Sequence, residues 1–372
     1  MTNENRLVLE LCRFRHPQKE RLREMLSTPY DAAMVLGQLM YHRMGAIAFY
    51  VLTICGLTGK VNREFRNALR SAYDSGRRQT IEFRRMMSET ADLLERVDFP
   101  YAVLKGARLA YEYPEGLRTS NDLDILIRQR DIDDLSMRLK EAGYIQGYIR
   151  DGRLFPATRS EILDSRLNRG ETVPFVRQND QDTMKHCEID INFSLDFKAK
   201  QSSRSVELLL EDIRPMNVDG DRLLMTLSQE DFLLHLCAHL YKEAVVYPWV
   251  LMGRDLALYK FCDLYLLLDK EGDASLAGRL AHRIHTCGLE KECYYALSLT
   301  ALLFDMDQPW LAALLQDIRP SDTTYMCEII DPEKERKYQY SMNFVDWLFC
   351  PCRAACLQET GAGEAGKASR KG

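Results

Sequence analysis

The chain has 372 residues, of which 46% are hydrophobic and 28% are charged, and its formal net charge is −5 at pH 7. This length allows two or three domains with buried cores, and the composition excludes a disordered or fibrous protein. The acidic balance also supplies no basic field for sequence-independent binding of nucleic acid, so nucleic acid is not an expected partner.

The N-terminal sequence is charged from its start and lacks the apolar core of a secretory signal. The most apolar window, residues 44–57, is too short to span a bilayer and predicts a buried helix. The 11 cysteines do not follow the even spacing of a disulfide framework. We therefore expect reduced thiols, a cytoplasmic location and no membrane association.

Apolar residues spaced three and four apart predict an N-terminal helical region over residues 1–96. The pattern then changes, and residues 97–227 read as a mixed α/β unit. Its predicted elements, in chain order, are a strand at 101–104, a turn at 106–107, a helix at 108–113, a strand around 122–127, a helix at 131–142, a strand at 184–195 and a hairpin at 216–227.

Beyond this unit the helical pattern returns, and Ser228 is the predicted N-cap of the first helix. We expect a C-terminal helical domain over residues 228–357. The last segment, residues 358–372, is rich in glycine, alanine and charge, which predicts a disordered tail.

Two aspartates interrupt the apolar strand at 122–127. Alternate residues of a strand share a face, so Asp122 and Asp124 project together, with Cα atoms roughly 6.5–7 Å apart. Two neighbouring carboxylates repel unless a proton, a cationic side chain or a divalent cation neutralises them. Asp190, in the alternating strand at 184–195, offers a third carboxylate, with Glu188 as its rival on the same face. Such oxygen ligands suit Mg²⁺, in a site of two ions.

A turn suited to phosphate precedes these acids. Gly106 and Ala107 join a strand to a helix, where free backbone N–H groups can hold phosphate oxygens. Gly106 lets the backbone approach a ligand closely. A phosphate cradle and metal-binding acids in one short segment favour phosphoryl-group chemistry.

The order of these motifs resembles the nucleotidyltransferase superfamily that includes DNA polymerase beta. The pattern runs from Leu104-Lys-Gly-Ala107 through Arg118-x-x-x-Asp122-x-Asp124 to Ile189-Asp190-Ile191. Within that superfamily the chain is similar to a bacterial family of uncharacterised nucleotidyltransferases. The similarity extends to Tyr41-His-Arg43, to residues 227–239 and to Cys262-Asp263-Leu264.

This resemblance implies an α+β fold in which a polymerase-beta-like core, a mixed sheet with helices, is flanked by N- and C-terminal helical regions. It also implies an enzyme that moves a nucleoside monophosphate, with AMP from ATP as the expected case, to a small molecule or a protein side chain. Asp122 and Asp124 would bind both Mg²⁺ ions and Asp190 the catalytic one. The implied nucleotide-binding residues lie in two short stretches: Lys105, Gly106 and Ala107, and Arg118 and Ser120.

Two positions depart from the usual motif. Ala107 stands where relatives have serine or glycine, and Asn192 where they often carry histidine. Both departures favour an alternative function, a low-turnover nucleotide-binding regulator or antitoxin-like partner with the same fold. A nucleic-acid-end transferase is a third possibility, disfavoured by the acidic balance and the lack of a basic, aromatic-rich tract.

Other clusters have plainer interpretations. His235 and His239 lie one helical turn apart, but without the glutamate of a metalloprotease helix, so we expect buried or substrate-facing histidines. Cys350, Cys352 and Cys356 lack an accompanying Cys/His pair, which favours ordinary thiols over a metal site.

Overall fold

The computed structural model describes residues 1–168, 170–195 and 204–362. The chain divides into two compact units: unit 1 comprises Met1–Leu69 and Leu236–Gly372, and unit 2 comprises Arg70–His235. The divisions fall within two helices, α5 (Arg63–Leu94) and α10 (Gln229–Ala244). Unit 1 thus draws on both predicted helical regions, whereas unit 2 is the predicted core together with most of α5.

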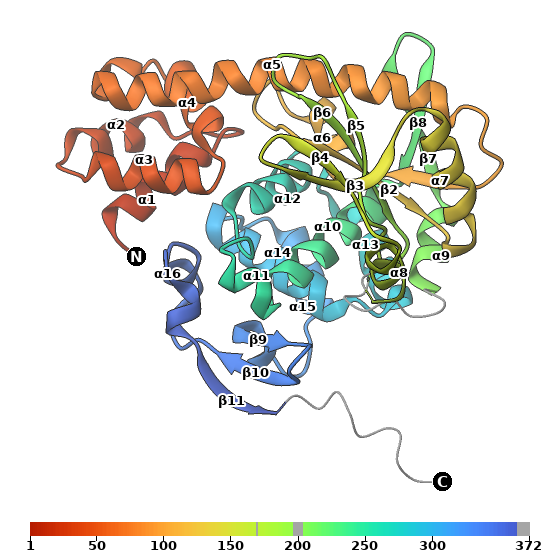
Figure 1. Ribbon diagram of the computed structural model, residues 1–372. Helices are drawn as coiled ribbons and strands as arrows, with labels where there is room; N and C mark the ends of the chain where they lie inside the picture. Colours follow the sequence, from red (N-terminus) through yellow and green to blue (C-terminus); the bar gives the residue numbers. More distant parts are fainter. Residues whose placement is uncertain (169, 196–203, 363–372) are drawn as a thin grey trace. The chain divides into compact units, whose positions relative to one another are not determined.

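Unit 2 is built on an eight-stranded mixed sheet, so the predicted α+β class is confirmed (Figure 1). Its strands run in the order β4-β3-β5-β6-β2-β1-β8-β7. The pairs β2/β6 and β1/β8 are parallel, and the other neighbours are antiparallel. The strands are β1 (Tyr101–Val103), β2 (Asp122–Ile127), β3 (Ile145–Arg150), β4 (Arg153–Pro156), β5 (Phe175–Gln178), β6 (His186–Asn192), β7 (Ile213–Asp219) and β8 (Arg222–Leu227).

Besides parts of α5 and α10, the described residues of unit 2 form four shorter α-helices and a 3-10 helix, η2: α6 (Gly106–Glu112), η2 (Gln129–Asp131), α7 (Ile132–Glu141), α8 (Arg159–Asn168) and α9 (Arg204–Glu211). One face of the sheet forms the core with α5, α6 and α7, because alternate apolar residues of β2 and β6 are fully buried there. This cluster includes Leu123, Ile125, Ile189 and Ile191 from the strands and Phe83 from α5.

The predicted elements of unit 2 match the structure closely. The expected strand at 122–127 is β2, and the central part of the expected strand at 184–195 is β6. The hairpin turns at Gly220, whose φ is +53°. One prediction was displaced: Gly106 and Ala107, expected in a turn, already form the first turn of α6.

Unit 1 is mainly helical, and its helices come from both ends of the chain (Figure 1). The N-terminal ones are α1 (Asn3–Cys12), α2 (Lys19–Ser27), α3 (Ala32–Tyr41), α4 (Gly45–Ile54) and the 3-10 helix η1 (Thr58–Lys60). The C-terminal ones are α11 (Tyr247–Leu251), α12 (Leu258–Glu271), α13 (Ala274–Cys287), α14 (Glu290–Phe304), α15 (Pro309–Asp317), η3 (Thr324–Cys327), α16 (Phe344–Leu348) and η4 (Arg353–Cys356). The apolar window at 44–57 supplies the largely buried helix α4, as expected.

Unit 1 also contains a sheet. The prediction that helices alone would precede a disordered tail at residues 358–372 was therefore wrong. Three antiparallel strands follow α15: β9 (Glu328–Asp331), β10 (Arg336–Gln339) and β11 (Gln358–Ala362). The composition of residues 358–362 predicted disorder, yet these residues pair with β10. The backbone hydrogen bonds of an antiparallel pair do not depend on apolar side chains, so a strand at the edge of a sheet can form without them. The rest of the predicted tail, residues 363–372, lies outside the described residues.

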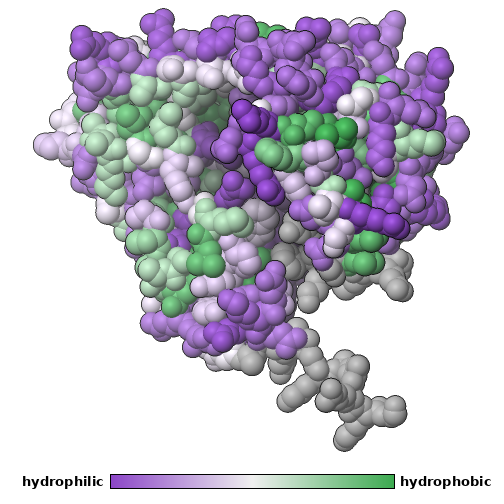
Figure 2. Space-filling view, viewed as in Figure 1, coloured by the Kyte–Doolittle hydropathy of each residue, from purple (hydrophilic) through white to green (hydrophobic). Residues whose placement is uncertain are grey.

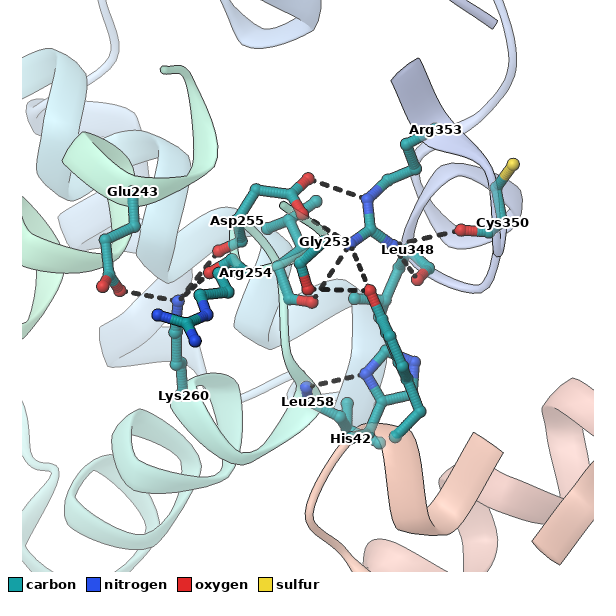
Figure 3. A network of polar contacts seen from close by, with 12 residues as sticks. His42, Glu243, Gly253, Arg254, Asp255, Leu258, Lys260, Leu348, Cys350 and Arg353 are labelled. Atoms are coloured by element: carbon teal, nitrogen blue, oxygen red, sulfur yellow. Dashed lines mark hydrogen bonds and ion pairs between the residues drawn. The ribbon is translucent and has the colours of Figure 1, made fainter. Parts of the chain in front are cut away.

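A buried ion pair lies in the C-terminal part of unit 1 (Figure 3). The guanidinium of Arg353 in η4 contacts both carboxylate oxygens of Asp255, at 2.7 and 2.5 Å. It also donates to the backbone carbonyls of Leu348 and Cys350 and, at 3.0 Å, to the hydroxyl of Tyr41 in α3. Arg353 is 3% exposed and Asp255 0%. The ion pair is therefore shielded from water, whereas the bond to Tyr41 lies at the edge of the buried region, because Tyr41 is 45% exposed.

His42 completes the contact with the N-terminal helices. Its Nδ1 accepts a hydrogen bond of 3.2 Å from the backbone N–H of Leu258 (Figure 3). Burial, reinforced by the charge of Arg353, lowers the pKa of His42 to about 3, so its ring stays neutral. A neutral ring is required there, since an imidazolium could not accept this bond.

The visible surface is mostly hydrophilic, and its apolar side chains gather in separate patches (Figure 2). Scattered exposed apolar residues are normal for a folded protein. Among the described helices, none combines the length and the apolar character needed to cross a bilayer.

Candidate functional site

Four carboxylates lie on one face of the central parallel strands of unit 2. The register of β2 and β6 pairs Asp122 with Glu188 and Asp124 with Asp190. Residues paired in this way on neighbouring strands have Cα atoms about 4.8 Å apart. The sequence predicted three of these acids and their rival Glu188, and the structure brings all four together on the face opposite Leu123 and Ile189.

The pKa values of two of these acids, Asp190 and Glu188, are raised. Burial raises the pKa of Asp190 well above its usual range, and the negative charges of Asp124, Asp122, Glu188 and Glu171 add to the rise. Burial and the charges of Asp122 and Asp124 also raise the pKa of Glu188. Among the described residues, no hydrogen-bond donor contacts the carboxylate of Asp190. The cluster thus carries more negative charge than its protein neighbours neutralise.

Among the four acids, Asp124 accepts hydrogen bonds from two side chains that offset its negative charge. Its Oδ1 lies 3.1 Å from the ammonium nitrogen of Lys105 and accepts a second bond, also of 3.1 Å, from the side-chain amide of Asn192. Asp124 is only 7% exposed, so its charge requires such partners. Lys105 adopts an unusual backbone conformation, φ +34° and ψ −109°, immediately before α6. Strain of this kind is often found at functional sites.

The chemistry of this donor set fits a divalent cation, although the side chains do not converge as they stand. Within the parts of the chain that the structure describes, no group of three or more histidine, cysteine, aspartate or glutamate side chains is arranged to hold a metal ion. Asp124 turns to Lys105 and Asn192, while Asp122 accepts a 2.9 Å bond from the hydroxyl of Ser120. Rotation about side-chain bonds moves such carboxylates without changing the strands.

Neutralising Asp190 should stabilise the metal-free protein. Because its pKa is raised in the folded state, the folded protein keeps a proton that the unfolded chain releases, so stability falls as pH rises from about 4 through the raised pKa. We expect Asp190→Asn to lack this loss and to melt at least about 2 °C higher near neutral pH. Thermal melts in a chelator between about pH 4 and 8 measure the difference.

Asp133→Asn is the matched control for that experiment. Asp133 belongs to Asp131-Ile-Asp133, which has the same spacing as the site pair, but its side chain is 85% exposed and bonded to Arg166. This variant should follow the wild-type pH profile. A profile of Asp190→Asn that also matches the wild type would show that the cluster is not repulsive.

The predicted phosphate-binding turn is shaped by close packing. A Cβ at Gly106 would lie 2.4 Å from the hydroxyl oxygen of Ser120, so only glycine fits against this side chain. Ala107 is buried in the core, and its backbone N–H donates to the carbonyl of Leu104 at 3.1 Å. Ser120, in turn, holds Asp122. Gly106 and Ser120 therefore lie beside the acids, whereas the side chain of Ala107 packs in the hydrophobic core.

Sequence reasoning missed how the loop before β2 is positioned. Helix α5 holds this loop, residues 114–121: Gln79 donates to the backbone carbonyl of Ser120, and Arg77 bonds to Glu115 at 3.0 Å. The backbones of Gly76 and Gly116 approach each other closely, because neither residue has a side chain. The half-buried Arg118 donates to the carbonyl of Thr119. The sequence contains one signal for the contact of α5 with this loop: Gly76 is a single glycine inside an amphipathic helix. A glycine in such a position usually allows close packing.

Gly76→Ala should loosen this contact. The added Cβ would lie 2.4 Å from the carbonyl oxygen of Gly116, and since that atom belongs to the backbone, α5 or the loop must move. We expect unit 2 to lose about 1–3 kcal/mol in its free energy of unfolding, measured by urea denaturation. Gly37→Ala is the control, because a Cβ at this glycine in α3 meets nothing within 4 Å. Equal effects of the two variants would contradict the close-contact interpretation.

The remaining sequence candidates lie on helices. His235 and His239 both belong to α10, one turn apart as predicted, and His235 is buried. The Nε2 of His239 lies 3.1 Å from Glu243. Asp263 is buried in α12.

An α+β unit with carboxylates on its parallel central strands, next to a strand, a glycine and a helix, has the architecture of the nucleotidyl-transfer class. A family model described as "Uncharacterised nucleotidyltransferase" matches residues 29–305, and the chain belongs to this family. The family predicted from the sequence is thereby confirmed.

The other comparisons add little. None of the curated proteins compared matches the chain. A solved structure of an antigenic nucleotidyltransferase-like protein from Paracoccidioides brasiliensis is similar at 15% identity, with 63% of this chain and 92% of that chain covered and a TM-score of 0.37.

Proposed function

We propose that the protein is a Mg²⁺-dependent nucleotidyltransferase that transfers a nucleoside monophosphate, AMP from ATP in the expected case, to a hydroxyl or phosphate of a small molecule or a protein side chain. The observation that carries this proposal is the set of four acids paired in register on β2 and β6. Family membership supports nucleotidyl transfer as the reaction class.

Asp122, Asp124 and Asp190 are the residues that would hold two Mg²⁺ ions, with Glu188 as the alternative to Asp190. Bound Mg²⁺ would supply neutralisation of the triphosphate and a lower pKa for the acceptor group. The pairing favours Asp190 over Glu188, because Asp190 lies opposite Asp124, the more buried aspartate of the pair.

In the proposed reaction an acceptor oxygen attacks the α-phosphorus of the nucleotide, and the bond from this phosphorus to the pyrophosphate oxygen breaks. The carboxylate of Asp190 takes the proton of the acceptor. Lys105 balances phosphate charge, since its ammonium group already lies 3.1 Å from the carboxylate of Asp124. Arg118, Gly106 and Ser120 border the same segment and would contact the phosphates.

Pyrophosphate release tests this proposal. The protein is incubated with each nucleoside triphosphate, Mg²⁺ and a cell extract as the source of acceptors, and with nucleotide labelled in its α-phosphate to detect modification of the protein itself. We expect release that requires Mg²⁺ and disappears in Asp122→Asn but persists in Asp133→Asn. Release by Asp122→Asn at the wild-type rate would exclude this site as its source.

The second candidate is a nucleotide-binding regulator with little turnover. Two observations favour it: the N–H of Ala107 is already bonded to Leu104, and Asn192 donates to Asp124 in place of the histidine of many relatives. Nucleotide binding with no pyrophosphate release under any of these conditions would support the regulator. Salt-sensitive extension of an oligonucleotide would instead point to a nucleic-acid acceptor.

A further inference from the structure

Two thiols meet in the C-terminal part of unit 1. The sulfur atoms of Cys350 and Cys356 lie 3.8 Å apart, at the two ends of the segment Cys350-Pro-Cys-Arg-Ala-Ala-Cys356. Both side chains are partly exposed, so a small reagent can reach them. Cys352, between them in the sequence, is exposed.

The pair is close to the geometry of a disulfide. An S–S bond of about 2.05 Å requires the sulfur atoms to approach by about 1.8 Å, a movement within reach of side-chain rotation in a surface segment. The 3-10 helix η4 turns the chain so that Cys356 faces Cys350. Among the residues that the structure describes, no cluster of cysteines with histidines or acids could hold a metal ion, so the contact is between thiols and not between metal ligands.

We propose that Cys350 and Cys356 form a reversible disulfide in response to low-molecular-weight disulfides of the glutathione type. The thiolate of Cys350 attacks the reagent disulfide, forming a mixed disulfide and releasing one reagent thiolate. The thiolate of Cys356 then attacks the sulfur of Cys350, and the second reagent thiolate leaves. The protein thus loses two protons and two electrons, and the reagent disulfide is reduced to two thiols.

The order of attack follows from the contact between the two thiols. The hydrogen bond with Cys350 raises the pKa of Cys356, so Cys356 keeps its proton longer. Because the thiolate is the nucleophile, this raised pKa favours Cys356 as the thiol that attacks in the second step.

The disulfide would act on the buried ion pair of unit 1. The ring that it closes contains Arg353, whose guanidinium holds Asp255 and also donates to the carbonyl of Cys350 itself (Figure 3). Closing the ring fixes the backbone on both sides of Arg353 and lowers the conformational freedom of the unfolded segment. Oxidation should therefore tighten the contact of the C-terminal segment with Tyr41 and Asp255. Cytoplasmic disulfides, where they occur, are usually catalytic or redox-sensing.

Trypsin offers a direct test, because it cleaves after Arg353, between the two cysteines. The full-length protein is equilibrated in mixtures of oxidised and reduced glutathione, its free thiols are blocked, and it is denatured and digested without reductant. We expect peptides 338–353 and 354–367 to remain joined in the oxidised sample and to separate after dithiothreitol. The link should persist in Cys352→Ser and vanish in Cys350→Ser and in Cys356→Ser.

Thermal melts supply an independent measurement. The wild type and Cys352→Ser should melt at a higher temperature when oxidised than when reduced, and Cys350→Ser should show no such shift. The proposal is overturned if no linked peptide forms in fully oxidising glutathione, or if the link forms in Cys350→Ser, which would assign it to Cys352. Linked peptides without any shift in melting temperature would overturn the proposed effect on Arg353.

Discussion

Asp124→Asn should reduce the rate of pyrophosphate release by about 10³-fold or more, which corresponds to about 4 kcal/mol of lost charge stabilisation. The asparagine keeps an oxygen that can accept the bonds from Lys105 and Asn192, so the local structure should persist. What it loses is the negative charge that would bind the cations. The measurement is the initial rate of release at saturating nucleotide and Mg²⁺.

Two observations separate loss of chemistry from loss of folding in this variant. Its urea denaturation midpoint should lie at or above that of the wild type, because removing one charge relieves the repulsion with Asp190. The control Asp133→Asn should retain the wild-type rate, since Asp133 is exposed and bonded to Arg166. A rate of Asp124→Asn within a factor of ten of the wild type would refute the proposed role of Asp124.

Asp255→Ala should destabilise unit 1 by about 3–5 kcal/mol, the usual cost of leaving one partner of a buried ion pair uncompensated. Arg353 would keep its charge in a site that is 3% exposed, and its remaining partners among the described residues would be backbone carbonyls and Tyr41. Because Arg353 also bonds to Tyr41, we expect both the C-terminal segment and α3 to lose stability. Urea denaturation followed by circular dichroism measures it.

Arg63→Ala is the control for the buried pair. Arg63 contacts Glu64 at 2.9 Å, but their side chains are 77% and 71% exposed, so solvent screens this pair. Its removal should change stability by less than about 1 kcal/mol. If Asp255→Ala were equally mild, water would have to reach Arg353, contrary to the burial seen in the structure.

The sequence was most informative where a local pattern determines the structure. In β2 and β6, alternation of acids with leucine and isoleucine predicted both the strands and the face that each residue occupies, because a half-buried strand must alternate. It also placed Asp122, Asp124 and Asp190 on one side of their strands. The register that pairs these acids was not predicted, since alternation within a strand carries no information about its neighbour.

The features that sequence reasoning missed depend on distant partners. The contact of Lys105 with Asp124 requires an unusual backbone conformation that no propensity favours. The strands β4 and β5 have four residues each, and β11 has a composition typical of disorder; backbone pairing, and not side-chain pattern, determines them. The close contact of Gly76 with Gly116 joins residues that are neighbours only in the folded unit.

The division of the chain has a consequence for biosynthesis. Unit 2 is one continuous segment, Arg70–His235, whereas unit 1 needs both Met1–Leu69 and the segment that begins at Leu236. On the ribosome the eight-stranded sheet can close soon after its last strand leaves the exit tunnel, because domains generally fold as units during synthesis. The first helices must wait until translation supplies their partners: Leu258, which bonds to His42, and Arg353, which bonds to Tyr41. We therefore expect the nascent N-terminal helices to be the part of this protein that most needs a chaperone.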